Sequence, residues 1–315
     1  MNVFKKQEMN TKAVLTTYVP LIVLVLITLF FQIISQGKLL SKGNIIALLN
    51  AGFTICIGGI GVSFLMAQGN LDFSMGSVAG LAAALSGFSA HINPFLSIIV
   101  GILVGAICGL VNGIIHTQFN VPSIITTLST AFIFRGIQQT LITTGAVSLP
   151  GSMMRLENVN LKLVVLLVLL VTCGILFSKM RLGKFSKFIG SRIDAAYQSG
   201  IQITKMKIGC FVIAGCSAGL VGFFFLVRAA SVSANTGVGY EFDVLLAMLL
   251  GGVPIAGGTG AKFRGVIIGS LIITILSNGM TLWGLDSVLQ QFIRGIIFLI
   301  SVSLSFDRSA ITVIE

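Results

Sequence analysis

The sequence is poor in charged residues, and acidic residues are the scarcest. Only 9% of its 315 residues are charged, with 20 Lys and Arg but only 9 Asp and Glu. Hydrophobic residues make up 55% of the chain and its mean hydropathy is +1.04, which leaves too few polar side chains to cover a water-soluble globule. This scarcity of charge excludes an ordinary soluble protein and predicts a polytopic membrane protein.

Cysteine is also scarce and is not arranged for covalent or metal chemistry. The five cysteines form no C-x-x-C pair and lie within apolar runs, at Cys56, Cys108, Cys173, Cys210 and Cys216. This pattern favours small buried side chains over a disulfide framework or a zinc site, so no metal and no cofactor is expected. The net charge of +11 does not indicate a nucleic-acid partner, because the basic residues fall between apolar runs and not on one soluble face.

Two catalytic motifs are missing. The chain has no G-x-x-x-x-G-K-[ST] phosphate loop, so it cannot bind and hydrolyse ATP by that route. It has no G-x-S-x-G elbow, and its two histidines, His91 and His116, fall at the ends of expected spans on opposite faces of the membrane. We therefore expect no catalytic residue and no enzyme activity from this chain alone.

The apolar runs predict an all-α protein with about ten transmembrane helices, of which the third and eighth are short. We expect one transmembrane domain over residues 1–315, with the polar stretch of residues 179–207 as its connector. The first run lacks a small-residue cleavage site and is too long for a signal peptide, so it should remain as a span. The ten spans are expected near Ala13–Ile34, Ile45–Met66, Met75–Ala90, Pro94–His116, Pro122–Thr143, Leu161–Ser178, Ile208–Val227, Asp243–Ala256, Gly265–Trp283 and Val288–Phe306.

Basic residues between the spans set the expected orientation. An even number of spans places both termini on the same side of the membrane. If that side is the cytoplasm, thirteen of the 20 basic residues are cytoplasmic. Most of them lie in the connector of residues 179–207, which is the longest polar stretch between two apolar halves. The expected location is a bacterial inner or plasma membrane, in contact with lipid and with both termini in the cytoplasm.

The connector contains a short helix pattern from Arg192 to Ser199. Ser191 is placed to be its N-cap, Asp194 falls in the first turn, where the helix dipole favours an acid, and Gly200 follows as the C′ residue. A short cytoplasmic helix between spans is suited to docking a partner. The residues expected to couple to that partner are Arg192, Asp194, Ala195, Ala196, Ser199 and Gly200.

Glycines recur every fourth residue along the expected fourth span. Gly101, Gly105, Gly109 and Gly113 form one smooth stripe of the small-xxx-small kind that allows two helices to approach closely. Gly215 with Gly219, and Gly265 with Gly269, repeat the pattern more briefly. We expect a packing role for these glycines.

Two polar stretches interrupt the membrane pattern. QGNLDFSMGS (Gln68 to Ser77) precedes the short third span, which Asp72 or Ser74 could cap, and NTGVGYEFD (Asn235 to Asp243) precedes the short eighth span. They are either surface loops or broken helices that line a conduit. In the expected topology they enter from opposite faces, an arrangement compatible with two inverted five-helix halves.

Four motifs in order give the chain a family resemblance. QGNLDFSMGS resembles the pattern G-x-[DN]-[LF]-S-x-G-S, and VPSIITTLSTAFIFRGI resembles V-P-x-[FI]-I-[AT]-T-L-x-T-x-x-x-x-R-G. SRIDAAYQSGI resembles the pattern N-x-x-A-A-x-x-S-G-I. NTGVGYEFDVLLAMLLGGVPIAGGTG resembles the pattern G-x-G-Y-E-L-[DE] followed by L-G-G-x-x-x-x-G-G-x-G. These patterns are typical of the permease subunit of ribose-type ABC importers, which serve ribose, other simple sugars and autoinducer-2. The chain departs from them at Arg192, where Asn is usual, and at Val253 and Pro254, which replace a small polar pair.

The resemblance implies an ATP-driven importer for a simple sugar, ribose-like, in which this chain forms the translocation path. Its expected partners are an ABC ATPase subunit, an extracytoplasmic sugar-binding protein and a second permease copy as a homodimer. The residues expected along the path are Asn70, Asp72, Ser74, Asn112, Arg135, Asn235, Tyr240 and Glu241.

A secondary, ion-coupled transporter of a small polar solute is the alternative, since broken helices and inverted repeats are equally typical of it. Such transporters commonly carry an ionisable relay within their spans. Here the acids fall at expected span ends, and only Arg135 and Arg294 lie well inside spans, where they either extend toward the outer end or contact sugar. This placement argues against proton or sodium coupling.

Overall fold

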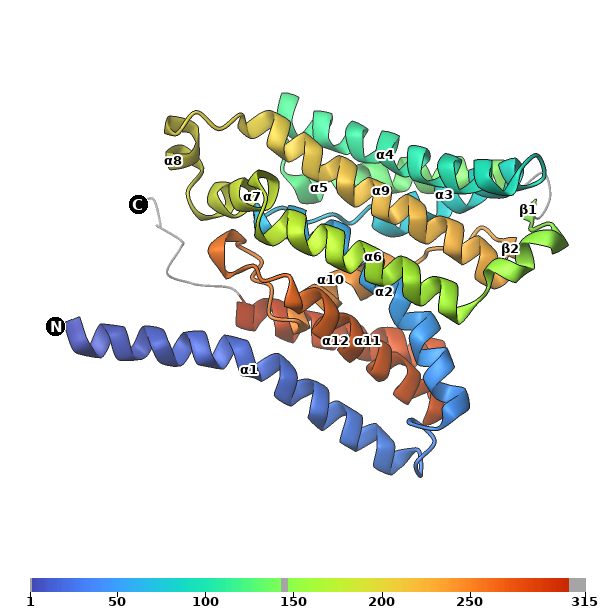
Figure 1. Cartoon of the computed structure of the whole chain (residues 1–315), viewed down its shortest axis with the longest axis horizontal. Coiled ribbons are helices and arrows are strands. Elements are labelled where there is room, and N and C mark those ends of the chain that lie inside the picture. The colour runs from blue at the N-terminus through green and yellow to red at the C-terminus, as the bar shows by residue number, and fades with distance from the viewer. Residues whose placement is uncertain (1, 143–146, 306–315) are drawn as a thin grey trace.

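The computed structural model describes residues 2–142 and 147–305, and these form a helical bundle (Figure 1). The helices are α1 (Asn2–Ile34), α2 (Lys42–Ala67), α3 (Met75–Ala90), α4 (Pro94–Gln118), α5 (Ser123–Ile142), α6 (Val159–Ser178), α7 (Arg181–Ser191), α8 (Ile193–Gln198), α9 (Ile203–Ala229), α10 (Tyr240–Leu250), α11 (Arg264–Leu282) and α12 (Ser287–Ser305). Short elements complete them: strands β1 (Val147–Ser148) and β2 (Ser231–Val232), which pair antiparallel, and 3₁₀ turns η1 (Gly151–Leu156) and η2 (Gly258–Gly260). Each of the ten expected spans overlaps a helix, so the all-α prediction is confirmed. The helix of the eighth span, α10, ends at Leu250 and not at the expected Ala256, and the expected span ends Thr143 and Phe306 lie outside the described residues.

The helices differ in their fitness to cross a membrane. Among the described residues, five are long and apolar enough to do so by length and composition: α2, α4, α6, α9 and α11. Shorter apolar helices are Tyr18–Ile34 of α1, all of α3, and Ser287–Ser303 of α12. α10 has only 11 residues, so it accounts for the short eighth span expected from the sequence.

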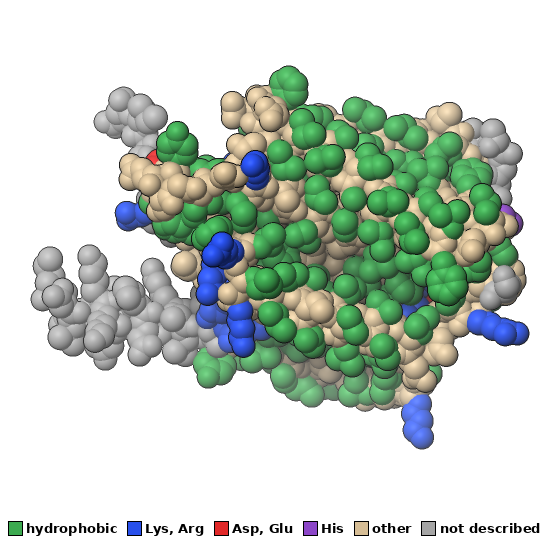
Figure 2. All heavy atoms as spheres, turned by 45° about the horizontal axis from the view of Figure 1, so that its top comes forward, with side chains coloured by type: hydrophobic (Ala, Val, Ile, Leu, Met, Phe, Trp, Pro, Cys, Tyr) green, Lys and Arg blue, Asp and Glu red, His purple; other side chains and the backbone are tan. Residues whose placement is uncertain are grey.

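The outer surface of the bundle is apolar, as lipid contact requires. Large hydrophobic side chains are exposed along α6, for example Val164, Leu167, Val168 and Val171. Figure 2 shows hydrophobic side chains spread over most of the visible face, with basic side chains toward both ends and more of them at the left. The arrangement is that of a multi-pass membrane protein, and hydrophobic burial from water cannot by itself hold such helices together.

The glycine stripe of α4 packs against α9, as its spacing predicts. Side chains added at Gly105 and Gly215 would collide with each other's backbone, and the same holds for Gly101 and Gly219. The two helices therefore approach at backbone contact, where dispersion forces between many atoms replace the missing hydrophobic effect. Gly269 of α11 plays the equivalent part against Ala247 of α10. The packing role of these glycines is confirmed.

The helices divide between two buried clusters that meet at α2 and α10. The larger is built on α2, α3, α4 and α9, and the smaller joins α1, α10 and α11 through residues such as Phe31, Leu246 and Ile273. α1 begins, and α12 ends, on the side of the bundle that carries α7 and α8 (Figure 1). The connector and both ends of the helical chain thus share one face.

Candidate functional site

The two interrupted stretches, 160 residues apart in sequence, lie against each other inside the bundle. The first turn of α3 packs on the loop and first turn that open α10, so that Gly76 faces the carbonyl of Gly237 and the carboxylate of Glu241. A side chain at Gly76 would have no space, and Gly237 has a φ of +82°, which glycine adopts without strain. Two helix starts therefore meet head to head, and neither stretch is an ordinary surface loop.

Asp72, Ser74 and Asn112 form one buried network at the start of α3. Asp72 Oδ1 accepts hydrogen bonds from the backbone N–H of Ser74 at 2.8 Å and from its Oγ at 2.6 Å, and Asn112 Nδ2 donates to the same Oγ at 2.8 Å. All three side chains are buried. The expectation that Asp72 or Ser74 caps α3 directly is wrong, because neither accepts from an N–H inside the helix. Asp72 instead fixes Ser74, which joins α3 to α4.

This network predicts that Asp72 matters through geometry. Asp72→Asn keeps an oxygen that can accept from the Ser74 N–H, so we expect most transport to remain. Asp72→Ala leaves two buried donors of Ser74 without an acceptor, a loss of about 1–3 kcal/mol in unfolding free energy. Uptake and thermal stability of the purified variants would check this. Loss of uptake in Asp72→Asn, with stability unchanged, would instead show that the charge itself is needed.

Arg135 of α5 is anchored inside the bundle and does not extend to its outer end. Its Nη1 donates to the carbonyl of Thr236 at 2.7 Å and to Gln138 Oε1 at 3.1 Å. Gln138 Nε2 in turn donates to the same carbonyl at 3.1 Å. Arg135 also shares a cavity of about 260 Å³ with Glu241, whose opposite charge interacts with it. α5 thus holds the loop that opens α10.

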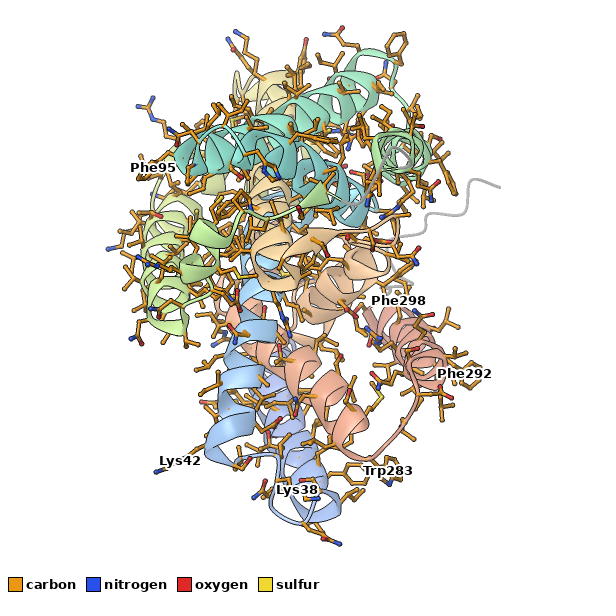
Figure 3. All side chains as sticks on the ribbon, turned by 90° about the vertical axis from the view of Figure 1, so that its right-hand side faces the viewer. Lys38, Lys42, Phe95, Trp283, Phe292 and Phe298 are labelled. Carbon is orange, nitrogen blue, oxygen red and sulfur yellow. The ribbon has the colours of Figure 1, made fainter. Side chains whose placement is uncertain are left out.

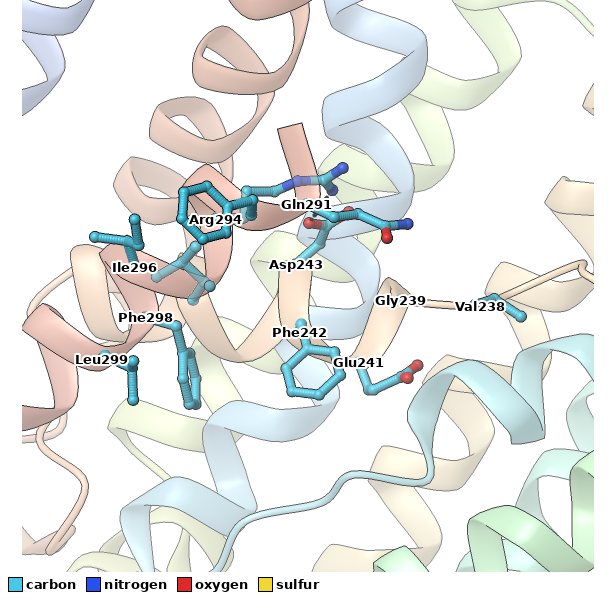
Figure 4. Close-up of a pocket in the computed structure, with 13 residues that line it drawn as sticks. Val238, Gly239, Glu241, Phe242, Asp243, Gln291, Arg294, Ile296, Phe298 and Leu299 are labelled. Atoms are coloured by element: carbon cyan, nitrogen blue, oxygen red, sulfur yellow. Dashed lines mark hydrogen bonds and ion pairs between the residues drawn. The ribbon is translucent and has the colours of Figure 1, made fainter. Parts of the chain in front are cut away.

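The first turn of α10 carries a second arginine–acid pair. Arg294 Nη1 of α12 donates to Asp243 Oδ1 at 2.6 Å, and both side chains remain about one-fifth exposed. They line a groove of about 660 Å³ between α10 and α12, whose walls are mostly apolar (Figure 4). In this view Glu241 points away from Asp243, toward α3. Both acids fall in the first turn of α10, so the sequence expectation that they lie at a span end agrees with the structure.

The other residues expected along the path lie in different surroundings. Tyr240 is buried and its hydroxyl donates to the carbonyl of Thr54 at 2.8 Å. Asn70 is buried, and its Nδ2 lies 3.5 Å from Gln68 Oε1, whereas Asn235 is exposed in the loop before α10. Among the described residues, no group of three or more His, Cys, Asp or Glu side chains could hold a metal ion.

The connector folds as two helices, α7 and α8, instead of one. Ser191 ends α7 and its hydroxyl donates to the Lys187 carbonyl, so its expected role as N-cap of α8 is wrong; Arg192 occupies that position without a side-chain cap bond. The C-terminal prediction is confirmed. Gly200 has a φ of +74°, its N–H bonds the Tyr197 carbonyl, and the next N–H bonds the Ala196 carbonyl, which is a Schellman motif.

The surface of α8 differs from the expected one. Ala196 is fully buried, so it cannot contact a partner. Two apolar residues that the sequence analysis did not single out are exposed instead, Ile193 by 45% and Tyr197 by 75%. Their position on a short helix beside charged residues is a signal the sequence did contain, since neither fits a lipid-facing run. Both lie beside Asp194, which is also exposed.

α7 connects α8 to the first interrupted stretch and to the 3₁₀ turn η2, which follows α10. Gln68, which follows α2, donates from Nε2 to Ser186 Oγ at 3.2 Å, and the N–H of Thr259 in η2 donates to Ser191 Oγ at 3.1 Å. Gly190 packs directly on the backbone of Ala67 and Gly258. Lys187 Nζ of α7 lies 4.2 Å from the centroid of the Phe177 ring. The partial burial of this side chain lowers the pKa of Lys187. A displacement of α7 would therefore reach the segments that open α3 and follow α10.

Comparison with known proteins gives a consistent result. Residues 44–302 match the family model described as branched-chain amino acid transport system / permease component. The ribose import permease protein RbsC of Bacillus subtilis is 33% identical over 262 residues, which cover 79% of this chain and 80% of that protein. The probable ABC transporter permease protein YphD of Escherichia coli is 32% identical, covering 90% and 87% of the two chains.

A third relative carries a different substrate in its name. The autoinducer 2 import system permease protein LsrC of Photorhabdus luminescens is 29% identical over 249 residues, which cover 76% of this chain and 75% of that protein. No solved structure matches the chain. The relatives thus agree on a permease component and differ in the molecule imported.

Proposed function

The chain belongs to the family of branched-chain amino acid transport system / permease components, and from this premise we propose that it forms the membrane path of an ATP-driven importer for a simple sugar such as ribose. The observation that carries the proposal is the 33% identity to a ribose import permease along four-fifths of both chains. The meeting of α3 and α10 inside the bundle supports it, since polar helix starts at that depth suit a path for a polar solute.

The family is one of transport subunits, so ATP hydrolysis belongs to a partner. We infer that an ABC ATPase docks on α8 and that a sugar-binding protein delivers substrate to the opposite face. The bonds from α7 to Gln68 of the first interrupted stretch and to Thr259 of η2, which follows α10, support this route for coupling. We propose Arg192, Asp194, Ala195, Ser199 and Gly200 as coupling residues, together with Ile193 and Tyr197, whose side chains are exposed on α8.

We also infer that both termini and the connector face the cytoplasm of a bacterial inner membrane. ATP is available in the cytoplasm, so an ATPase that docks on α8 requires α8 to lie on the cytoplasmic side of the membrane. The basic side chains at the connector end of the molecule support this orientation (Figure 2). Lys38, Lys42 and Trp283 gather at the opposite end, seen in Figure 3, where an aromatic ring suits the membrane–water boundary.

A second copy of the chain is proposed as the other half of the path. α12 stands at the edge of the bundle with Phe292 directed outward in Figure 3, and this side chain is 64% exposed. Phe292 also lines the groove between α10 and α12. Pairing two copies there would enclose the path residues Arg135, Tyr240 and Glu241 between them.

The test is reconstitution of the permease with its ABC ATPase and its sugar-binding protein. Vesicles that contain the permease should accumulate labelled ribose, or another neutral sugar from a panel, only with ATP on the connector side and binding protein on the other. Omission of any one component should reduce uptake to the background of empty vesicles. Uptake driven by a proton or sodium gradient without ATP would contradict the proposal and favour a secondary transporter, for which the comparisons give no support.

A further inference from the structure

A second cavity lies beside the groove, and the Asp243–Arg294 pair forms part of the wall of both. Its volume of about 440 Å³ falls within the roughly 300–1,000 Å³ that is usual for small-molecule sites. Five helices contribute to its lining: α2, α9, α10, α11 and α12. The polar side chains that the argument uses are Thr54, Arg228, Asp243, Ser277, Asn278 and Arg294.

Apart from the exposed guanidinium of Arg228, the cavity offers donors and acceptors of hydrogen bonds whose charges cancel within one ion pair. Asp243 and Arg294 neutralise each other at 2.6 Å, and Arg294 Nε also donates to the Gln290 carbonyl at 3.3 Å. The Thr54 hydroxyl donates its hydrogen to the Ala51 carbonyl, so Thr54 Oγ1 remains able to accept a hydrogen bond from a ligand. The Ser277 hydroxyl is enclosed, and within residues 2–142 and 147–305 it has no hydrogen-bond partner.

An aromatic side chain completes the lining. Phe225 of α9 borders the cavity, and its ring lies edge-on to that of Tyr240 at a centroid distance of 5.2 Å. Small-molecule sites commonly combine such an apolar wall with a few polar groups that fix orientation. A solute with one apolar face and hydroxyl groups that both donate and accept fits this combination.

We propose that this cavity is a transient subsite for a neutral polyhydroxylated molecule of monosaccharide size, and that the Asp243–Arg294 pair is its polar anchor. The inference rests on the proposed sugar-import function and assigns a place for the sugar within this chain. An acid and a guanidinium together bind adjacent hydroxyl groups, the acid as acceptor and the guanidinium as donor. Ser277 supplies the hydroxyl that the unliganded protein leaves without a partner.

The inference is tested first by protection of a cysteine. In a variant without the five native cysteines, Ser277→Cys should react with a small impermeant thiol reagent added from the side opposite the connector. Saturating transported sugar should slow this reaction at least five-fold, and a sugar phosphate at the same concentration should not. Ser287→Cys, an exposed position at the start of α12, is the control and should react equally fast with or without sugar.

The second measurement separates binding from coupling in the full importer. Asp243→Asn and Arg294→Gln should each reduce sugar uptake at least ten-fold, while ATP hydrolysis stimulated by the binding protein stays within two-fold of the unmutated importer. Asp286→Asn is the matched control, because Asp286 caps α12 outside the cavity, through the Leu289 N–H at 2.7 Å, and Asn can still accept that bond. It should leave both activities unchanged.

Three outcomes overturn the subsite. Equal labelling of Ser277→Cys with and without sugar, in an importer that transports the sugar, rejects the cavity and leaves the proposed function intact. Protection by the sugar phosphate but not by the neutral sugar rejects the neutral ligand class. Absence of ATP-dependent uptake of every neutral sugar by the unmutated importer removes the proposed function, and the subsite with it. If Asp243→Asn does not insert, the labelling result on Ser277→Cys decides alone.

Discussion

Replacing Gly105 by leucine is expected to abolish accumulation of folded permease in the membrane. A side chain at this position of α4 would meet the Gly215 carbonyl and the Gly219 amide of α9, both of them backbone atoms that cannot move aside. Overpacking usually costs about 1–3 kcal/mol where side chains can adjust, and the cost is higher when two helix backbones must separate. The yield of monodisperse protein after detergent extraction, and its unfolding temperature, measure the effect.

The control for this prediction is on the partner helix. Gly209 of α9 has no atom within 4 Å of the position of an added Cβ, so Gly209→Leu should insert and extract at close to the normal yield. If both leucine variants were equally depleted, glycine would matter through backbone flexibility. If neither were depleted, the close contact of α4 with α9 would not be needed for folding.

Removing the exposed apolar residues of α8 is expected to detach the ATPase. The side chain of Tyr197 is 75% exposed and that of Ile193 is 45% exposed, so both can contact a partner. Buried tyrosines at interface centres commonly contribute 2 kcal/mol or more, which is roughly a thirty-fold loss of affinity. Ile193→Ala with Tyr197→Ala should therefore greatly reduce ATPase recovered with the purified permease, and sugar uptake with it.

The matched control is Gln198→Ala on the same helix, whose side chain is exposed and polar. It should retain both ATPase co-purification and uptake, because exposed polar contacts at an interface rim contribute little. Normal ATPase recovery in the double alanine variant would show that α8 is not the docking element. It would also remove the main support for a cytoplasmic connector.

Several features of the fold could be predicted because their signals are local in the sequence. Apolar length and its interruptions locate ten helices, and the spacing of Gly101 to Gly113 shows a packing face without its partner. The positive φ at Gly200 is likewise set by the end of a short helix. Such features need only neighbouring residues, so one sequence is enough to predict them.

The partners within the site could not be predicted, since each contact joins distant segments. Asn112 reaches Ser74 across 38 residues, Arg294 reaches Asp243 across 51, and Arg135 reaches Thr236 across 101. Hydropathy assigned the two arginines to spans but could not show what their side chains bond. The local capping pattern predicted Asp72 as a helix cap. In the structure the carboxylate of Asp72 instead holds Ser74 against α4.

By itself the sequence determined that this is an all-α membrane protein with a glycine-packed pair of helices, a basic connector and two polar interruptions. These properties follow from composition and spacing, which act over one or two helical turns. Only the tertiary structure decided that the interruptions meet, that α7 bonds to the first of them and to η2, and that Ala196 is buried while Tyr197 is exposed. The reason is physical: hydropathy tells which residues enter the membrane, and close packing of backbones decides which of them touch.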